Sequence, residues 1–198
     1  MTDFSVVICT YNGEHRLPIL LDRLRAQVIP QSLNWEILIV DNNSHDQTAQ
    51  CIHTYQQQWS TSSSLRYAFE PRQGLAYARR CAMQLVTGEW VGFLDDDTLP
   101  SEDWVAQAHG FGQRHPQVGA YGSAISGRSE STPPEGFERI ASCLAVIQRG
   151  DISFPYDVSQ GVLTAGAGMV VRRRAWPECV PTDPALSGLF GANLRTKR

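Results

Sequence analysis

Residues 89–100 read EWVGFLDDDTLP, an apolar run that leads directly into three consecutive acidic residues. The apolar half is typical of a strand that is buried on both faces of a sheet. Carboxylates side by side repel one another and resist burial, so Asp95, Asp96 and Asp97 belong at the open end of that strand. Taken alone, such a triplet is more often a solvated turn than a cation site, and the rest of the chain has to decide between the two.

Three similar strands precede this one along the chain. The sequence predicts them at residues 4–10 (FSVVICT), 35–41 (WEILIVD) and 65–70 (LRYAFE). Helices are predicted between and after the strands, at residues 17–24, from the segment after Ser44 to about 59, at 73–87 and at 100–114. Strand and helix thus alternate four times, which predicts an α/β fold with a mainly parallel, Rossmann-like sheet flanked by helices on both faces.

Local signals suggest where these helices begin and end. Ser44 is a plausible N-cap for the second helix, Gly88 a C-cap for the third, and Pro100 with Ser101 opens the fourth. The regular alternation stops near Gly127, where a Pro/Ser-rich loop begins. After it we expect a short helix at 137–148 and a strand at 165–171 (AGAGMVV). We therefore divide the chain into two parts of the same globular domain, residues 1–126 and residues 127–198, the second of which looks incomplete at its C-terminal end.

Composition excludes several classes of function. The chain has 198 residues and a formal net charge of -3, so it lacks the basic field of a nucleic-acid-binding protein. No apolar segment approaches the ~20 residues that a spanning helix needs, and no leader pattern opens the chain. The five cysteines are widely spaced without a zinc-ligand pattern, which indicates free thiols in a reducing compartment. The expected location is cytoplasmic.

Polar residues follow each of the four predicted strands, and in a parallel sheet these strand ends share one edge. A carboxylate such as Asp41 can accept a hydrogen bond from a base or a ribose, and Arg79 can bind base carbonyls or phosphate oxygens. Asp95 and Asp97, separated by one residue, can present oxygens to a hard divalent ion that bridges two phosphates. The sequence shows neither a G-x-G-x-x-G loop after the first strand, nor a P-loop, nor a nucleophile elbow.

With these residues assembled, the chain resembles glycosyltransferase family 2, the inverting nucleotide-sugar transferases of the GT-A fold. The resemblance is carried by SVVICTYN, WEILIVDNNSHDQT, EPRQGLAYARRCAM, TGEWVGFLDDDTLPSEDWV and, less strongly, AGAGMVVRR. It implies a Mn2+- or Mg2+-dependent enzyme of bacterial polysaccharide or cell-surface glycan assembly, with a UDP-sugar as the expected donor. The acceptor would be a glycan or lipid-linked hydroxyl, which leaves peripheral association with a membrane open.

The resemblance also implies roles for individual residues. Thr10, Tyr11 and Asn12 would line the base pocket, and Asp41 would bond the base with Asn43 nearby. Further donor contacts would come from Arg72, Gln73, Gly74, Leu75 and Arg79. Asp95 and Asp97 would hold the metal, and Asp96 between them would touch the ribose or the metal.

One departure concerns the general base, which in this family is an acidic residue some distance beyond the strand that AGAGMVVRR resembles. Glu178 and Asp183 are the acidic residues available there, and both precede the expected place. The resemblance therefore puts the base beyond residue 198 and suggests a shortened chain with impaired turnover. Two alternatives stay open at this point: a non-catalytic nucleotide-sugar binding module, and a phospho-transfer or receiver-like α/β domain that uses the acidic cluster for Mg2+.

Overall fold

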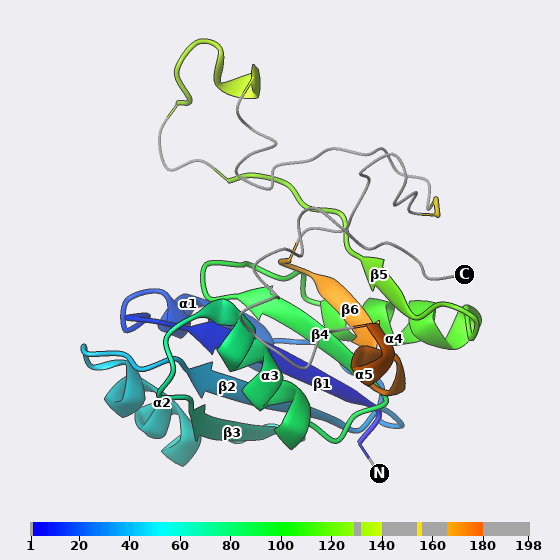
Figure 1. Ribbon diagram of the computed structural model, residues 1–198, viewed down its shortest axis with the longest axis horizontal. Helices are drawn as coiled ribbons and strands as arrows, with labels where there is room; N and C mark the ends of the chain where they lie inside the picture. The colour runs from blue at the N-terminus through cyan, green and yellow to red at the C-terminus, as the bar shows by residue number, and fades with distance from the viewer. Residues whose placement is uncertain (1, 129–131, 140–153, 156–165, 180–198) are drawn as a thin grey trace.

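A computed structural model describes residues 2–128, 132–139, 154–155 and 166–179 of the chain. In these residues, strands form one sheet in the order β3-β2-β1-β4-β6-β5 (Figure 1). The strands are β1 (Phe4–Thr10), β2 (Trp35–Asp41), β3 (Ser64–Phe69), β4 (Trp90–Asp95), β5 (Ala120–Gly122) and β6 (Met169–Arg172). The helices are α1 (Leu17–Arg25), α2 (Thr48–Gln57), α3 (Leu75–Leu85), α4 (Trp104–Arg114) and α5 (Trp176–Cys179), with short 3-10 turns at Phe137–Arg139 and Arg173–Ala175.

The four strands predicted from the alternating pattern pair in parallel. β1 lies between β2 and β4, and β3 extends the sheet beyond β2. The register places Thr10 beside Asp41, and Cys9 beside Asp95. The strand ends that carry the polar clusters therefore lie at the same edge, called here the carboxyl edge. The predicted α/β class and mainly parallel sheet are confirmed.

Helices cover both faces of the sheet because successive strand residues point to opposite sides. One apolar cluster joins Phe4, Val6 and Ile8 of β1 to the buried leucines of α1 and to residues of α2 and α4. A second cluster on the opposite face joins Val7 of β1 to Ala78 and Ala82 of α3 and to Trp176 of α5. Figure 1 shows α3 and α5 in front of the sheet. The central strands β1, β2 and β4 are thus covered by apolar side chains on both faces.

The remaining part of the sheet is antiparallel. β6 pairs with β4 in the opposite direction, and the short strand β5 pairs with the far side of β6. The strand predicted in AGAGMVV is confirmed, although it begins later, at Met169. β5 was not predicted, because three residues are too few to show an alternating pattern.

Three predicted helix boundaries were wrong. Ser44 does not cap α2; its hydroxyl accepts a hydrogen bond from the Asn12 backbone at 2.9 Å, while Asp46 Oδ1 accepts one from the Thr48 backbone at 3.0 Å. Gly88 does not cap α3, which ends at Leu85. A Cβ at Gly88 would lie 2.7 Å from the Ser5 backbone nitrogen, so the glycine allows a close approach of two chain segments. α4 begins at Trp104, after a turn in which the Trp104 N–H donates to the Ser101 carbonyl.

Some predictions fall on residues that the structure does not describe. Of the helix expected at 137–148, the part described is the 3-10 turn Phe137–Arg139, and the rest lies outside the described residues. Asp183 lies outside them as well. Among the described residues, no helix is both long enough and apolar enough to span a bilayer.

Candidate functional site

A hollow of about 190 Å³ lies at the carboxyl edge, between the ends of β1 and β2 and the first turn of α3. Its lining comprises Cys9, Thr10, Tyr11, Asn42, Gln73, Gly74, Leu75 and Ala78. Five of these residues were predicted to surround a nucleotide, namely Thr10, Tyr11, Gln73, Gly74 and Leu75. Burial raises the pKa of the Cys9 thiol to about 12, so this wall of the hollow is uncharged at neutral pH.

The loop that leads into α3 is fixed by a residue to which we had assigned no role. Asn42 is 5% exposed, and its amide nitrogen donates to the carbonyls of Glu70 and Arg72 at 3.1 and 2.7 Å. Its amide oxygen accepts from the Gly74 N–H at 2.7 Å. Gly74 has φ of 134°, a conformation that favours glycine. Asn42 therefore connects the end of β2 to the start of α3 in the wall of the hollow.

Asp41 is placed beside the hollow and is not part of its lining. It is 2% exposed, and its two carboxylate oxygens accept hydrogen bonds from the Ser44 backbone at 3.0 Å and the Tyr67 hydroxyl at 3.1 Å. Burial and the neighbouring Asp41 carboxylate raise the pKa of Tyr67 to about 12, so this hydroxyl stays protonated and remains a donor. The carboxylate is held in one orientation before any ligand arrives.

Asn12 and Asn43 shape the two loops that follow β1 and β2. Both have positive φ, 50° and 63°, which suits asparagine in tight turns. The Asn12 side chain accepts a hydrogen bond from the His45 backbone at 2.9 Å. The Asn12 N–H also donates to the Ser44 hydroxyl at 2.9 Å, and these two contacts hold the first loop against the second.

Arg72 and Arg79, both predicted to contact the donor, are placed differently from each other. The Arg72 guanidinium donates to both oxygens of Glu70, at 2.8 and 2.9 Å, and lies over the Tyr77 ring. These bonds to Arg72 lead the contacts that lower the pKa of Glu70. The Arg79 guanidinium lies over the Phe93 ring at 5.4 Å and faces the carboxylate of Asp95. Arg79 is thus the better placed of the two to meet an anion beside the acidic triplet.

The three acidic residues after β4 have different environments. Asp95 is partly buried, and burial, together with the charges of Asp97 and Asp96, raises its pKa, while Arg79 acts in the opposite direction. Asp97 is exposed. Within the described part of the chain, neither of these two carboxylates accepts a hydrogen bond. Asp96 is different, since it accepts hydrogen bonds from Thr10 at 2.6 Å and from Arg16 at 2.7 and 2.9 Å.

Asp95 and Asp97 are the two residues of the triplet that could hold a divalent cation. Carboxylate oxygens without hydrogen bonds are hard donors of the kind that Mg2+ prefers, and a nearby cation would offset the burial and the repulsion by Asp97 and Asp96 that raise the pKa of Asp95. The described residues contain no group of three or more His, Cys, Asp or Glu side chains that could enclose a metal.

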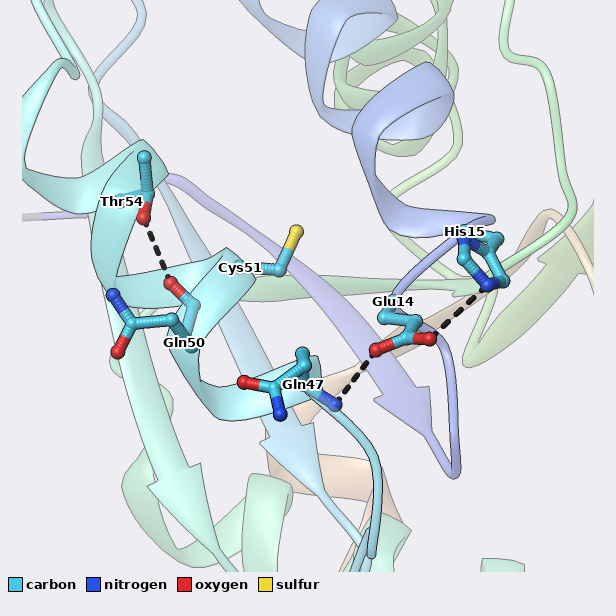
Figure 2. A pocket seen from close by; sticks show the side chains of 6 residues that line it. All are labelled: Glu14, His15, Gln47, Gln50, Cys51 and Thr54. Carbon is cyan, nitrogen blue, oxygen red and sulfur yellow. Dashed lines mark hydrogen bonds and ion pairs between the residues drawn. The ribbon is translucent and has the colours of Figure 1, made fainter.

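A second hollow, of about 380 Å³, lies away from these residues, against α2 (Figure 2). Its lining comprises Glu14, His15, Gln47, Gln50, Cys51 and Thr54. Glu14 accepts a hydrogen bond from the Gln47 backbone at 2.7 Å and lies 3.0 Å from a His15 ring nitrogen. None of the predicted site residues contributes to this lining.

Comparison with known proteins identifies the family. The sequence model of "Glycosyl transferase family 2" matches residues 5–172. The chain belongs to glycosyltransferase family 2. That assignment confirms the resemblance drawn from the five sequence motifs. The match covers the whole carboxyl edge and both antiparallel strands.

Several named glycosyltransferases are similar in sequence. The poly(ribitol-phosphate) beta-N-acetylglucosaminyltransferase TarS of Staphylococcus aureus is 31% identical over 116 residues, which are 58% of this chain and 20% of TarS. The UDP-Glc:alpha-D-GlcNAc-diphosphoundecaprenol beta-1,3-glucosyltransferase WfgD of Escherichia coli is 28% identical over 102 residues, 52% of this chain and 36% of WfgD. The chain thus matches between a fifth and about a third of the length of these curated relatives.

Solved structures show the same fold. Residues 1–349 of S. aureus TarS, in complex with UDP, match 96% of this chain and 53% of the TarS chain, with a TM-score of 0.67 and 20% identity. The Pyrobaculum calidifontis mannosyltransferase PcManGT, in complex with GDP-Man and Mn2+, matches 91% of this chain and 47% of its own, with a TM-score of 0.66 and 22% identity. The GT-A fold predicted from the motifs is confirmed.

Proposed function

We propose that this chain binds a nucleoside-diphosphate sugar, with a UDP-sugar as the preferred donor, and transfers the sugar with inversion to a hydroxyl acceptor in bacterial glycan assembly. The observation that carries the proposal is the carboxyl edge itself. A hollow of about 190 Å³ lies there close to two carboxylates that accept no hydrogen bond within the described residues and to the Arg79 guanidinium. A flat base, a diphosphate and its cation require these three features side by side.

The hollow has the chemistry of a base pocket. Tyr11 is 42% exposed and Leu75 is 48% exposed, although both are large apolar side chains in its wall. Exposed apolar surface beside ordered polar groups is typical of a ligand site. We place the base between these two side chains, with Asn42 and Asp41 holding the surrounding backbone and Asn12 and Asn43 shaping the loops above it.

The acidic end of β4 would hold the diphosphate through a cation. Asp95 and Asp97 would bind Mn2+ or Mg2+, which would supply positive charge to the departing diphosphate. Arg79 would stabilise the same charge directly, since a guanidinium can donate two parallel hydrogen bonds to phosphate oxygens. Arg72, Gln73 and Gly74 would complete the donor site from the loop before α3.

Transfer with inversion also needs a group that removes the acceptor's proton. General-base catalysis of this kind contributes on the order of 10²–10⁴ in rate. We place that base outside the described residues. The part from residue 127 onward would contribute to the acceptor side, and residues 1–126 would hold the donor.

Isothermal titration calorimetry with UDP, with and without Mn2+, tests the donor site. We expect UDP to bind, Mn2+ to strengthen binding by about tenfold or more, and Asp97→Asn to remove that strengthening, because the cation loses one of its two protein ligands. Glu102→Gln is the matched control, since Glu102 is an exposed acidic residue shortly after the triplet. Absence of UDP binding at saturating Mn2+ would contradict the proposal.

A transfer assay then separates an enzyme from a binding module. UDP-sugar is incubated with the chain and a hydroxyl acceptor, and both free sugar and transferred sugar are measured. Release of UDP that depends on Mn2+ and on Asp97 supports an enzyme. Tight binding without release of UDP would indicate a nucleotide-sugar binding module instead.

A further inference from the structure

The side chain of Asp96 is tied to the loop that follows β1. Arg16 donates to both of its carboxylate oxygens, from Nε to Oδ1 at 2.7 Å and from Nη2 to Oδ2 at 2.9 Å. The Thr10 hydroxyl adds a third hydrogen bond at 2.6 Å. Arg16 Nη2 also donates to the Tyr11 carbonyl at 3.1 Å. A single guanidinium therefore joins the acidic triplet to the wall of the base hollow.

The surrounding backbone leaves room for this contact. A Cβ at Gly13 would overlap the Thr10 hydroxyl oxygen and would lie 3.0 Å from Asp96 Oδ2. The Gly13 N–H donates to Thr48 Oγ1 at 2.8 Å, so the chain cannot simply move away from the pair. The absence of a side chain at residue 13 is thus needed for Thr10 and Asp96 to meet.

The contact also changes the charge of the triplet. Three adjacent free carboxylates could bind one cation in several alternative arrangements. The bidentate ion pair with Arg16 neutralises the Asp96 carboxylate and fixes its orientation, which leaves fewer arrangements. The Asp96 side chain is 13% exposed and Arg16 is 46% exposed, so the pair lies at the surface rather than in the core. Its effect on folding stability should therefore be modest, whereas its effect on the adjacent site is direct.

We propose that Arg16 is a positioning residue that withdraws Asp96 from the cation site, so that Asp95 and Asp97 alone among the triplet bind the metal. This inference rests on the proposed donor site and replaces the earlier expectation that Asp96 touches the ribose or the metal. Arg16 itself contacts neither the cation nor the nucleotide. Because Arg16 also donates to the Tyr11 carbonyl, it fixes the position of the hollow that would bind the base relative to Asp95 and Asp97.

The test measures the strengthening of UDP binding by Mn2+ in four variants by calorimetry. Asp96→Asn should keep the full strengthening, because Asp96 is not a ligand. Arg16→Gln should reduce it about threefold to tenfold, because the freed Asp96 carboxylate competes for the cation. The double variant Arg16→Gln/Asp96→Asn should recover it, because the competing charge is gone. Arg23→Gln, at an exposed arginine of α1, is the matched control and should be unchanged.

Thermal unfolding without ligand confirms that each variant is folded, and recovery in the double variant cannot arise from misfolding. Loss of the Mn2+ effect in Asp96→Asn would overturn the inference, as would failure of the double variant to recover it. If the wild-type chain binds UDP, either result contradicts the role of Arg16 without contradicting the proposed donor site. Failure of the wild-type chain to bind UDP would instead overturn the donor site and the role of Arg16 together.

Discussion

The two edges of the parallel sheet each carry a carboxylate that is buried or partly buried, Glu36 at one and Asp95 at the other, and the surroundings of these two groups are opposite. At the amino edge, Glu36 of β2 accepts hydrogen bonds from Ser5, from Arg66 and from both the backbone and the hydroxyl of Thr87, at 2.6–3.0 Å. At the carboxyl edge, Asp95 accepts none within the described residues.

The pKa shifts of these two residues follow from this difference. Burial alone would raise the pKa of Glu36, but the hydrogen bonds from Thr87, Ser5 and Arg66 outweigh it, and the pKa is lowered. Burial and neighbouring acids raise the pKa of Asp95. The carboxylate at the amino edge stabilises the fold, whereas the carboxylate at the carboxyl edge would gain a partner from the proposed cation.

The largest expected effect is on stability at the amino edge. Glu36→Leu removes the acceptor for three side chains and one backbone N–H and leaves Arg66 without its carboxylate. We expect the free energy of unfolding to fall by about 2–4 kcal/mol, measured by urea denaturation. Glu89→Leu is the control, because Glu89 lies at the same edge but is half exposed, and its ion pair with Arg172 is long, at 3.8 Å. A loss under about 1 kcal/mol would show that the two edges do not differ as described.

The opposite result is expected at Asp95. Asp95→Asn removes a charge whose ionisation is unfavourable in the folded chain, so we expect stability at pH 7 to rise by about 0.5–1 kcal/mol while the strengthening of UDP binding by Mn2+ is lost. Thermal unfolding and calorimetry on the same sample measure both effects. Asp97→Asn should share the loss of the metal effect with little change in stability.

The pH dependence of stability should distinguish the two carboxylates. The pKa of Asp95 lies above its usual value near 3.8, so its destabilising effect is fully present at neutral pH and disappears as the pH falls through the raised pKa. The pKa of Glu36 lies below its usual value near 4.5, so its stabilising effect is present above pH 4.5 and is lost as the pH falls further. On acidification both effects should therefore shrink: the advantage of Asp95→Asn should be gone once the pH is below 3.8, and the deficit of Glu36→Leu should decrease from pH 4.5 downward.

The smallest effect is expected at the larger hollow against α2. Gln50 is exposed there. Its backbone carbonyl accepts a hydrogen bond from the Thr54 hydroxyl, and any residue at this position would provide that acceptor. Gln50→Ala should change the affinity for UDP by less than about twofold and stability by less than about 0.5 kcal/mol. A clear loss of UDP affinity would move the donor site from the carboxyl edge to this hollow.

Most of the fold could be predicted because local patterns and topology agree. The buried runs of β1, β2 and β4 and the leucine spacing of α1 are strong signals, and the alternation of strands and helices determines which ends share an edge. The antiparallel position of β6 could not be predicted, since nothing in a four-residue strand specifies its partner or direction.

The site could be predicted only at the level of which residues gather at the edge. Asn42 and Arg16 were missed because their roles depend on partners far along the chain, Gly74 and Asp96 respectively. A polar residue after a strand is equally compatible with solvent, a ligand or another loop. Ser44 was misread for the same reason, because its hydroxyl serves Asn12 in a neighbouring loop rather than its own helix.

The pairing of β6 with β4 also has a consequence for how the chain folds as it is synthesised. β4 ends at Asp95, yet the strand that covers its outer edge begins only at Met169. Until that segment leaves the ribosome, the nascent sheet exposes the unpaired backbone of β4, and β5 has no strand to join. Exposed edges of this kind favour association with other chains, and contacts between distant segments form slowly. The outer edge of β4, the strand that ends at the acidic triplet, is thus the last edge of the parallel strands to gain its neighbour.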